Sequence, residues 1–169
     1  MRRYLLALLF LSATPTWAAE VRELTWSEMI PPDAPLQETS DAPIHDLSKL
    51  ADVLSAESAP AATQQSPAAP VVPALNDQVV KLPGYIVPLD VTDDGKVTEF
   101  LLVPYFGACI HVPPPPSNQI IYVTLREPVA VDELWEAVWV YGTLHTTRTS
   151  HELANSSYQM QGIRVESYE

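Results

Sequence analysis

The second half of the chain alternates between apolar and polar residues, which is the pattern of strands with one buried face. The first expected strand, residues 78–91, is interrupted by Pro83-Gly84, and such a pair is typical of a bulge or bend. Asp94-Gly95 follows, and this dipeptide favours a tight hairpin turn. The same pattern predicts further strands at residues 97–104, 119–125, 138–144 and 158–168.

One helix is expected within this series of strands. Residues 128–138, which include Glu133 and Trp135, suit a short helix between the third and fourth strands. The order β-β-β-α-β-β is that of the OB-fold, so we expect a mostly β protein with a small OB-like Greek-key barrel. Gly142 would let the fourth strand bend. An open sheet with the helix on one face is the alternative.

A short apolar stripe near the N-terminus predicts a helical arm that docks on the barrel. Trp26, Met29 and Ile30 share one helix face, and Thr25 with Glu28 forms a capping box. Two prolines at positions 31 and 32 would end the helix. We therefore expect residues 19–32 to form a docking arm with Trp26 as its anchor.

The segment between the arm and the first long strand has the composition of a linker. Residues 33–76 are rich in Ala, Pro, Ser and Gln, a composition that cannot build a core of its own. A short helix is possible at residues 44–54, where Ile44, Leu47 and Leu50 follow a helical stripe. The barrel domain is then expected to cover residues 77–169.

The first 18 residues have the layout of a secretory signal peptide. Arg2 and Arg3 precede a short apolar run, and Thr16-Trp17-Ala18 supplies small residues for cleavage after Ala18. The apolar run is too short to span a bilayer as an anchor. We therefore expect a periplasmic protein that is not anchored in the membrane once the signal is removed.

Charge and cysteine content narrow the possible partners. Residues 1–18 hold two arginines and no acidic residue, so their removal takes the net charge from −12 to −14. Such a chain repels phosphate backbones, and we expect no nucleic-acid partner. The single cysteine excludes an internal disulfide, so in an oxidising compartment its thiol must be buried, bound to a metal or paired between chains.

The densest candidate chemistry lies around this cysteine. Cys109 and His111 are two residues apart and would share one face of extended backbone, which makes them a natural half-site for zinc or copper. They could also form a thiol activated by its neighbour. Residues 113–116 are four prolines, which would hold the end of this segment in a stiff conformation. The alternative is structural, with a buried thiol and an imidazole that only makes hydrogen bonds.

Three stretches of the sequence resemble the signature of an exported bacterial family catalogued as a domain of unknown function. They read Gly-Tyr-Ile-Val-Pro-Leu at residues 84–89, Gly-Ala-Cys-Ile-His-Val-Pro-Pro-Pro-Pro at 107–116, and Leu-Thr-Trp at 24–26. The resemblance implies a periplasmic protein encoded beside ABC transporter permeases of the MacB/FtsX type, in some genomes within zinc-responsive clusters. It implies no enzyme activity, and it marks Cys109 and His111.

Three functions follow from these observations. The first is a metal-binding accessory protein of an envelope ABC transport system, with zinc held by Cys109, His111 and either His145 or His151. The second is a non-catalytic adaptor that docks on a transporter's periplasmic domain through the proline rim and its aromatic residues Tyr85, Tyr105 and Phe106. The third is a thiol enzyme with Cys109 as nucleophile. We expect the protein not to be an enzyme, because no oxyanion-forming motif accompanies the thiol.

Overall fold

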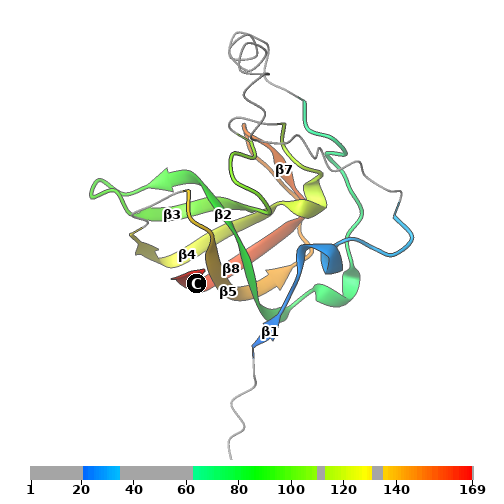
Figure 1. The fold of residues 1–169 in the computed structure, drawn as a ribbon, viewed down its shortest axis with the longest axis horizontal. Helices are drawn as coiled ribbons and strands as arrows, with labels where there is room; N and C mark the ends of the chain where they lie inside the picture. The colour runs from blue at the N-terminus through cyan, green and yellow to red at the C-terminus, as the bar shows by residue number, and fades with distance from the viewer. Residues whose placement is uncertain (1–20, 35–62, 110–112, 131–134, 169) are drawn as a thin grey trace, which may run out of the picture.

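The computed structural model describes residues 21–34, 63–109, 113–130 and 135–168 (Figure 1). The expected signal peptide, the possible helix at residues 44–54 and His111 lie outside these ranges. No helix among the described residues has the length and apolar character needed to cross a membrane.

Five long strands form a closed β-barrel. They are β2 (Gln78–Val91), β3 (Val97–Val103), β4 (Ile121–Val129), β5 (Val138–His145) and β8 (Tyr158–Ser167). They pair in the order β2-β3-β4-β8-β5, and β5 pairs with β2 to close the sheet. The pair β4–β8 is parallel, whereas the other barrel pairs are antiparallel. The prediction of a mostly β protein with a small barrel is confirmed.

The long strand β2 closes the barrel because it changes partner at Pro83-Gly84. Residues 78–84 pair with β5, and residues 85–91 pair with β3. A Cβ on Gly84 would lie 2.8 Å from the carbonyl oxygen of Val103, so only glycine allows this close approach of the strands. The hairpin between β2 and β3 turns at Gly95, whose φ is +79°, as the Asp-Gly pair predicts.

The prediction of a helix at residues 128–138 is wrong for residues 128–130 and 135–138, which the structure describes and which are not helical. Strand β4 continues to Val129, which pairs with Val97, and Trp135 lies in a turn. Residues 131–134 are outside the described part. Neighbouring β-branched side chains and a strand partner outweigh the weak helical pattern here. The OB-like subtype therefore stays a prediction.

Alternate residues of the strands face inward and form the main core. One inward row runs through Ile86, Leu102, Ile121 and Tyr158, which are paired across neighbouring strands and are all buried. The next row, facing outward, belongs to a second apolar cluster on the outside of the barrel, which loops cover. We call it the outer cluster; its buried members are Val87, Leu101, Val103, Ala108, Ile120 and Ala154.

The N-terminal arm is tied to β2. Strand β1 (Arg22–Glu23) pairs in parallel with β2, and the 3-10 helix η1 (Trp26–Met29) follows. The backbone N–H of Thr25 donates to Glu28 Oε2 at 2.8 Å, as the capping box predicts. Trp26 Nε1 donates to the carbonyl oxygen of Pro83 at 2.7 Å, and Met29 is fully buried. The helical part of the arm is a single 3-10 helix of four residues.

Residues 63–76, which composition assigned to a linker, pack against the barrel in the structure. The short helix η3 (Pro73–Leu75) buries Leu75. Ala69 is buried as well, and its N–H donates to Ser117 Oγ at 2.9 Å beside the short helix η4 (Ser117–Gln119). The strands β6 (Thr149–Ser150) and β7 (Asn155–Ser156) form a small separate hairpin near this segment. Hydrogen bonds to backbone atoms, which composition does not report, hold the segment in place.

Candidate functional site

Tyr122 packs against the outer cluster because its strand position turns it out of the barrel. It lies between the buried residues Ile121 and Val123 on β4, so its own side chain points to the opposite face. Its partners are Leu101 on β3 and Gln159 on β8, and Gln159 in turn pairs with His145 on β5. Side chains of directly paired residues share a face. Tyr122 and His145 therefore face the same side of the sheet, two strands apart.

Cys109 lies at the edge of this outer cluster, half-buried in the loop after β3. Burial raises the pKa of its thiol to about 11, so the group stays protonated at neutral pH. Its φ is +68°, and that of Gly107 is +81°. The extended backbone expected at Cys109 is therefore not found, and the argument that placed Cys109 and His111 on one strand face does not hold.

The side chain of His151 carries a buried ring nitrogen beside Tyr122. Its ring lies on the ring of Tyr122, with 4.4 Å between the centroids. Its Nε2 atom is buried, and no described residue provides a hydrogen-bond partner for it. The loop conformation is fixed by a hydrogen bond from the His151 backbone N–H to the carbonyl oxygen of Ala154, a member of the outer cluster. Burying a polar nitrogen without a hydrogen-bond partner costs roughly 1–3 kcal/mol of folding free energy. A bound ligand would remove this cost.

His145 has a different environment. Its Nδ1 lies 2.8 Å from Asp77 Oδ1, and the carboxylate is exposed. One nitrogen of the His145 ring is therefore already in contact with Asp77 at the surface. Among the expected ligands, Cys109 and His151 both border the outer cluster, whereas His145 lies two strands from Tyr122 and His111 is outside the described residues. Within the described ranges no three His, Cys, Asp or Glu side chains come together as a metal site.

The sequence pattern did not single out Tyr122 and Glu99. The Tyr122 hydroxyl donates to Glu99 Oε2 at 2.6 Å, and burial together with this bond raises the pKa of the phenol to about 12. Burial and the nearby Cys109 thiol also raise the pKa of Tyr105. The alternation of β4 was the signal that could have revealed Tyr122, because it puts an aromatic residue outside between two buried aliphatic ones.

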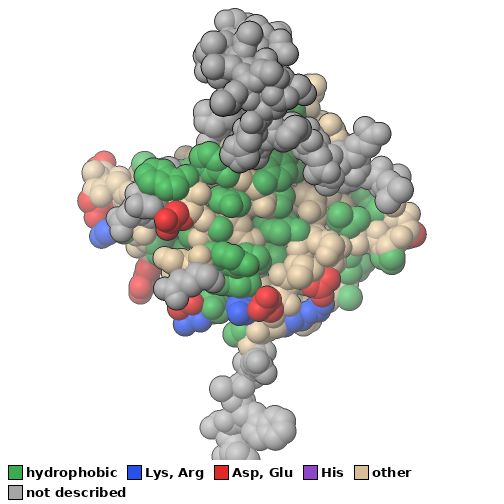
Figure 2. Space-filling view, viewed as in Figure 1, with side chains coloured by type: hydrophobic (Ala, Val, Ile, Leu, Met, Phe, Trp, Pro, Cys, Tyr) green, Lys and Arg blue, Asp and Glu red, His purple; other side chains and the backbone are tan. Residues whose placement is uncertain are grey.

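The expected docking rim is only partly exposed. Pro114, Pro115 and Pro116 are buried, so most of the proline run packs inside the protein instead of presenting a surface. Phe106 is 47% exposed and meets Tyr85 edge-on, with 6.0 Å between ring centroids. Figure 2 shows hydrophobic side chains across the middle of the visible face of the molecule.

Comparison with known proteins shows one family. The model of DUF3299, described as a protein of unknown function, matches residues 26–167. The chain is also similar to a DUF3299 family protein from Pseudomonas aeruginosa PAO1, whose crystal structure was determined at 2.45 Å. The two are 57% identical with a TM-score of 0.75, over 89% of this chain and 97% of the other. No curated protein matches the chain significantly.

Proposed function

The chain belongs to the DUF3299 family, and we propose that it is a periplasmic metal-binding accessory protein of an envelope transport system, with zinc as its metal. The metal-binding part of the proposal is supported by the structure around Tyr122. Export is supported by the sequence of residues 1–18, and the transport association by the family resemblance.

The buried Nε2 of His151 is the observation that carries the proposal. Among the described residues this nitrogen has no hydrogen-bond partner, so its lone pair is available to a cation, and its ring packs against the ring of Tyr122. Imidazole and thiolate are the ligands that zinc prefers, and Cys109 borders the same outer cluster. These two residues therefore form the core of the proposed site.

Two further histidines are candidate ligands. His111, which the sequence pattern paired with Cys109, is the proposed third ligand; it lies outside the described residues, so the variant His111→Ala tests its role. His145 is the weaker choice, because Asp77 already holds its Nδ1 and because β8 separates it from Tyr122. A water molecule or a partner residue would complete the four ligands, and an exchangeable fourth position suits transfer of the metal to a transporter.

The thiol-enzyme alternative has little support in this environment. A nucleophilic cysteine needs a lowered pKa, whereas burial raises the pKa of Cys109 to about 11. Metal binding would overcome the same burial by replacing the thiol proton, so the affinity for zinc should fall as the pH falls. We propose no catalytic activity for the protein.

The adaptor role is the second candidate, and one observation favours it. Phe106 is a large aromatic side chain that is 47% exposed beside Tyr85. Aromatic anchors of this kind often dominate protein interfaces. Capture of a permease's periplasmic domain that survives chelation, and that Phe106→Ala weakens, would support this role.

The test of the metal proposal is competition between the mature protein and a chromophoric zinc chelator. We expect Cys109→Ser, His111→Ala and His151→Ala each to weaken zinc binding by about tenfold or more, since each removes one ligand. His145→Ala is the matched control, because it removes an imidazole that faces the same side but is paired with Asp77. Circular dichroism of each variant establishes that it is folded. Equal zinc affinity in all four variants and the wild type would rule out the site.

A further inference from the structure

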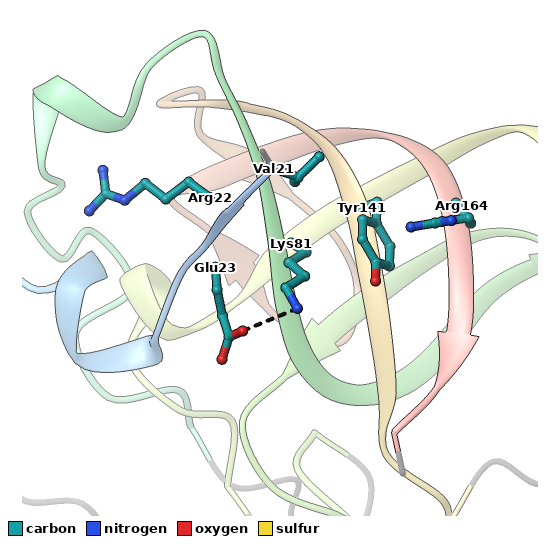
Figure 3. Close-up of a pocket in the computed structure, with 6 residues that line it drawn as sticks. All are labelled: Val21, Arg22, Glu23, Lys81, Tyr141 and Arg164. Atoms are coloured by element: carbon teal, nitrogen blue, oxygen red, sulfur yellow. Dashed lines mark ion pairs between the residues drawn. The ribbon is translucent and has the colours of Figure 1, made fainter. Parts of the chain in front are cut away.

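A groove lies on the barrel face formed by β1, β2, β5 and β8. One transverse row of paired residues crosses these four strands: Glu23 pairs with Lys81, Lys81 with Tyr141, and Tyr141 with Arg164. Together with Val21 and Arg22 they line a groove of about 490 Å³. Figure 3 shows Lys81, Tyr141 and Arg164 side by side, whereas Arg22 points away from Lys81. No member of the outer cluster lines this groove.

The two cations of the row are held in place by aromatic rings. The guanidinium of Arg164 lies 3.9 Å from the centroid of the Tyr141 ring, and the Lys81 ammonium lies 4.4 Å from that of Trp139. Such cation–π contacts restrict the long side chains before any ligand arrives. A ligand that binds here therefore loses less conformational entropy to ordering Lys81 and Arg164.

Both cations keep hydrogen-bond donors available. Lys81 contacts Glu23 at 3.1 Å, which uses one of its three N–H groups, and Arg164 contacts Glu166 at 3.1 Å through Nη1 alone. The Tyr141 hydroxyl between them makes no hydrogen bond to any described residue. Lys81 and Arg164 therefore offer unused N–H donors on either side of Tyr141.

The charge distribution of the whole molecule makes this groove distinctive. The chain carries a net charge of −12, so most of its surface repels anions. On the face seen in Figure 2, Lys and Arg side chains lie mainly along one edge, near the position of β1, and Asp and Glu side chains lie among them. Each of the three cations of the groove contacts one carboxylate, Arg22 with Glu28, Lys81 with Glu23 and Arg164 with Glu166, so an incoming carboxylate would bind through the donors that these contacts leave unused.

We propose that this groove binds a carboxylate-bearing ligand through Lys81 and Arg164, with the Tyr141 hydroxyl as an additional donor. The guanidinium of Arg164 has the planar geometry that suits a carboxylate. The ligand is either a free dicarboxylate or an acidic peptide segment of a partner, since both present the same group. This inference is independent of the proposed metal site.

The experiment is titration of the isotope-labelled mature protein with two probes, followed by backbone amide NMR. The probes are glutarate and a hexaglutamate peptide with blocked ends, and a blocked hexaglutamine peptide is the uncharged control. We expect saturable shifts centred on residues 81, 141 and 164 with at least one carboxylate probe and none with hexaglutamine. Binding of the peptide alone assigns the groove to a partner segment, whereas binding of glutarate assigns it to free carboxylates.

Two variants with matched chemistry sharpen the test. Lys81→Gln removes a lysine paired with one carboxylate, and Lys96→Gln does the same at the β2–β3 hairpin, where Lys96 contacts Asp94 at 2.9 Å. We expect Lys81→Gln and Arg164→Gln each to weaken binding by about tenfold, as for loss of one charge-assisted hydrogen bond, and Lys96→Gln by less than about twofold. Tyr141→Phe keeps the packing and should weaken binding only slightly. Absence of saturable shifts in the groove with both carboxylate probes, or equal weakening by Lys81→Gln and Lys96→Gln, would overturn the proposal.

Discussion

The imidazole of His151 lies on the phenol of Tyr122, with 4.4 Å between the ring centroids and 42° between the ring planes. The far end of the same phenol donates a hydrogen bond to Glu99 on β3. Tyr122 therefore connects the loop that carries His151 to the barrel wall. Any change in the ionisation or orientation of this phenol should therefore change the environment of the His151 ring.

The first prediction concerns the titration of Tyr122. Its pKa is raised from 10.0 to about 12, first by burial and then by the bond to Glu99, so the fold favours the neutral phenol. Stability from this group is fully present below pH 10 and is lost as the pH rises from 10 through about 12. The difference in unfolding free energy between wild type and Tyr122→Phe should therefore be constant below pH 10 and shrink above it. Denaturant unfolding monitored at several pH values measures this.

A matched variant separates the two causes. Glu99→Gln removes the charged acceptor but leaves the burial, so the pKa of Tyr122 should fall only part of the way toward 10. Absorbance of the phenolate during alkaline titration, with Tyr122→Phe subtracted, gives the value. An unchanged midpoint in Glu99→Gln would mean that the hydrogen bond does not contribute.

The second prediction concerns the reactivity of Cys109. Burial raises its thiol pKa from 9.0 to about 11, so little thiolate exists at neutral pH. Alkylation of the metal-free folded protein should be far slower at pH 7 than that of the same protein in denaturant, and the rate should rise with pH through about 11. Mass spectrometry after timed quenching gives both rates. Rapid stoichiometric labelling at pH 7 would instead revive the thiol-enzyme hypothesis.

Local signals in the sequence were enough to predict the barrel strands and several of their details. Pro83-Gly84 marked the point where β2 changes partner, and Asp94-Gly95 marked the hairpin. These features depend on backbone conformation at single residues, which residue type controls directly. The helix expected at residues 128–138 was wrong at its described ends because Val129 has a strand partner distant in the sequence, which a local pattern cannot report.

The candidate site was less predictable than the fold for a similar reason. The alternation of β4 puts Tyr122 outside the barrel, but it does not say that the outside is covered by loops carrying Cys109 and His151. The Cys-x-His spacing suggested a strand, whereas Cys109 has a positive φ. Contacts between distant loops decide which of the candidate ligands approach one another, and spacing along the chain gives no measure of them.

The third prediction tests the packing of residues 63–76 on the barrel. Ser117 is fully buried, and its Oγ accepts from the Ala69 N–H at 2.9 Å and lies 2.7 Å from Ser157 Oγ. Ser117→Ala removes this acceptor and the contact with Ser157, but the Ala69 N–H keeps the Ser66 carbonyl oxygen at 3.2 Å, so we expect a loss of about 0.5–1.5 kcal/mol of unfolding free energy. Limited proteolysis within residues 63–76 should also become faster. Ser27→Ala, at an exposed position, is the control and should change neither measurement.

The fourth prediction tests the N-terminal arm through Trp26. Trp26→Phe keeps most of the ring packing but loses the hydrogen bond from Nε1 to the carbonyl oxygen of Pro83. We expect a loss of about 0.5–1.5 kcal/mol in unfolding free energy and faster amide hydrogen exchange in residues 22–29. Gln119→Ala, which removes a bond from Gln119 Nε2 to the Trp26 carbonyl oxygen, should loosen the same residues. Unchanged exchange in both variants would mean that these bonds do not hold the arm.

The last prediction compares three glycines whose surroundings differ. A Cβ on Gly142 would collide with the carbonyl oxygen of Gln161 and lie 2.7 Å from Met160 Cγ, and the carbonyl belongs to a paired strand that cannot move freely. A Cβ on Gly162 would meet the end of the Leu125 side chain at 2.6 Å, which can rotate away. Gly95 has open space and a φ of +79°, which asparagine tolerates.

The expected order of destabilisation is therefore Gly142→Ala, then Gly162→Ala, then Gly95→Asn. Overpacking against backbone should cost about 1–3 kcal/mol or more for Gly142→Ala, whereas Gly95→Asn should cost less than about 1 kcal/mol. Gly142 follows Tyr141 on β5, so the shift that relieves the collision should also displace the Tyr141 ring from Arg164. Thermal unfolding ranks the stabilities, and the amide shifts of residues 141 and 164 report the displacement. Equal stability of Gly142→Ala and Gly95→Asn would mean that β5 and β8 are not as closely packed at this point as the structure describes.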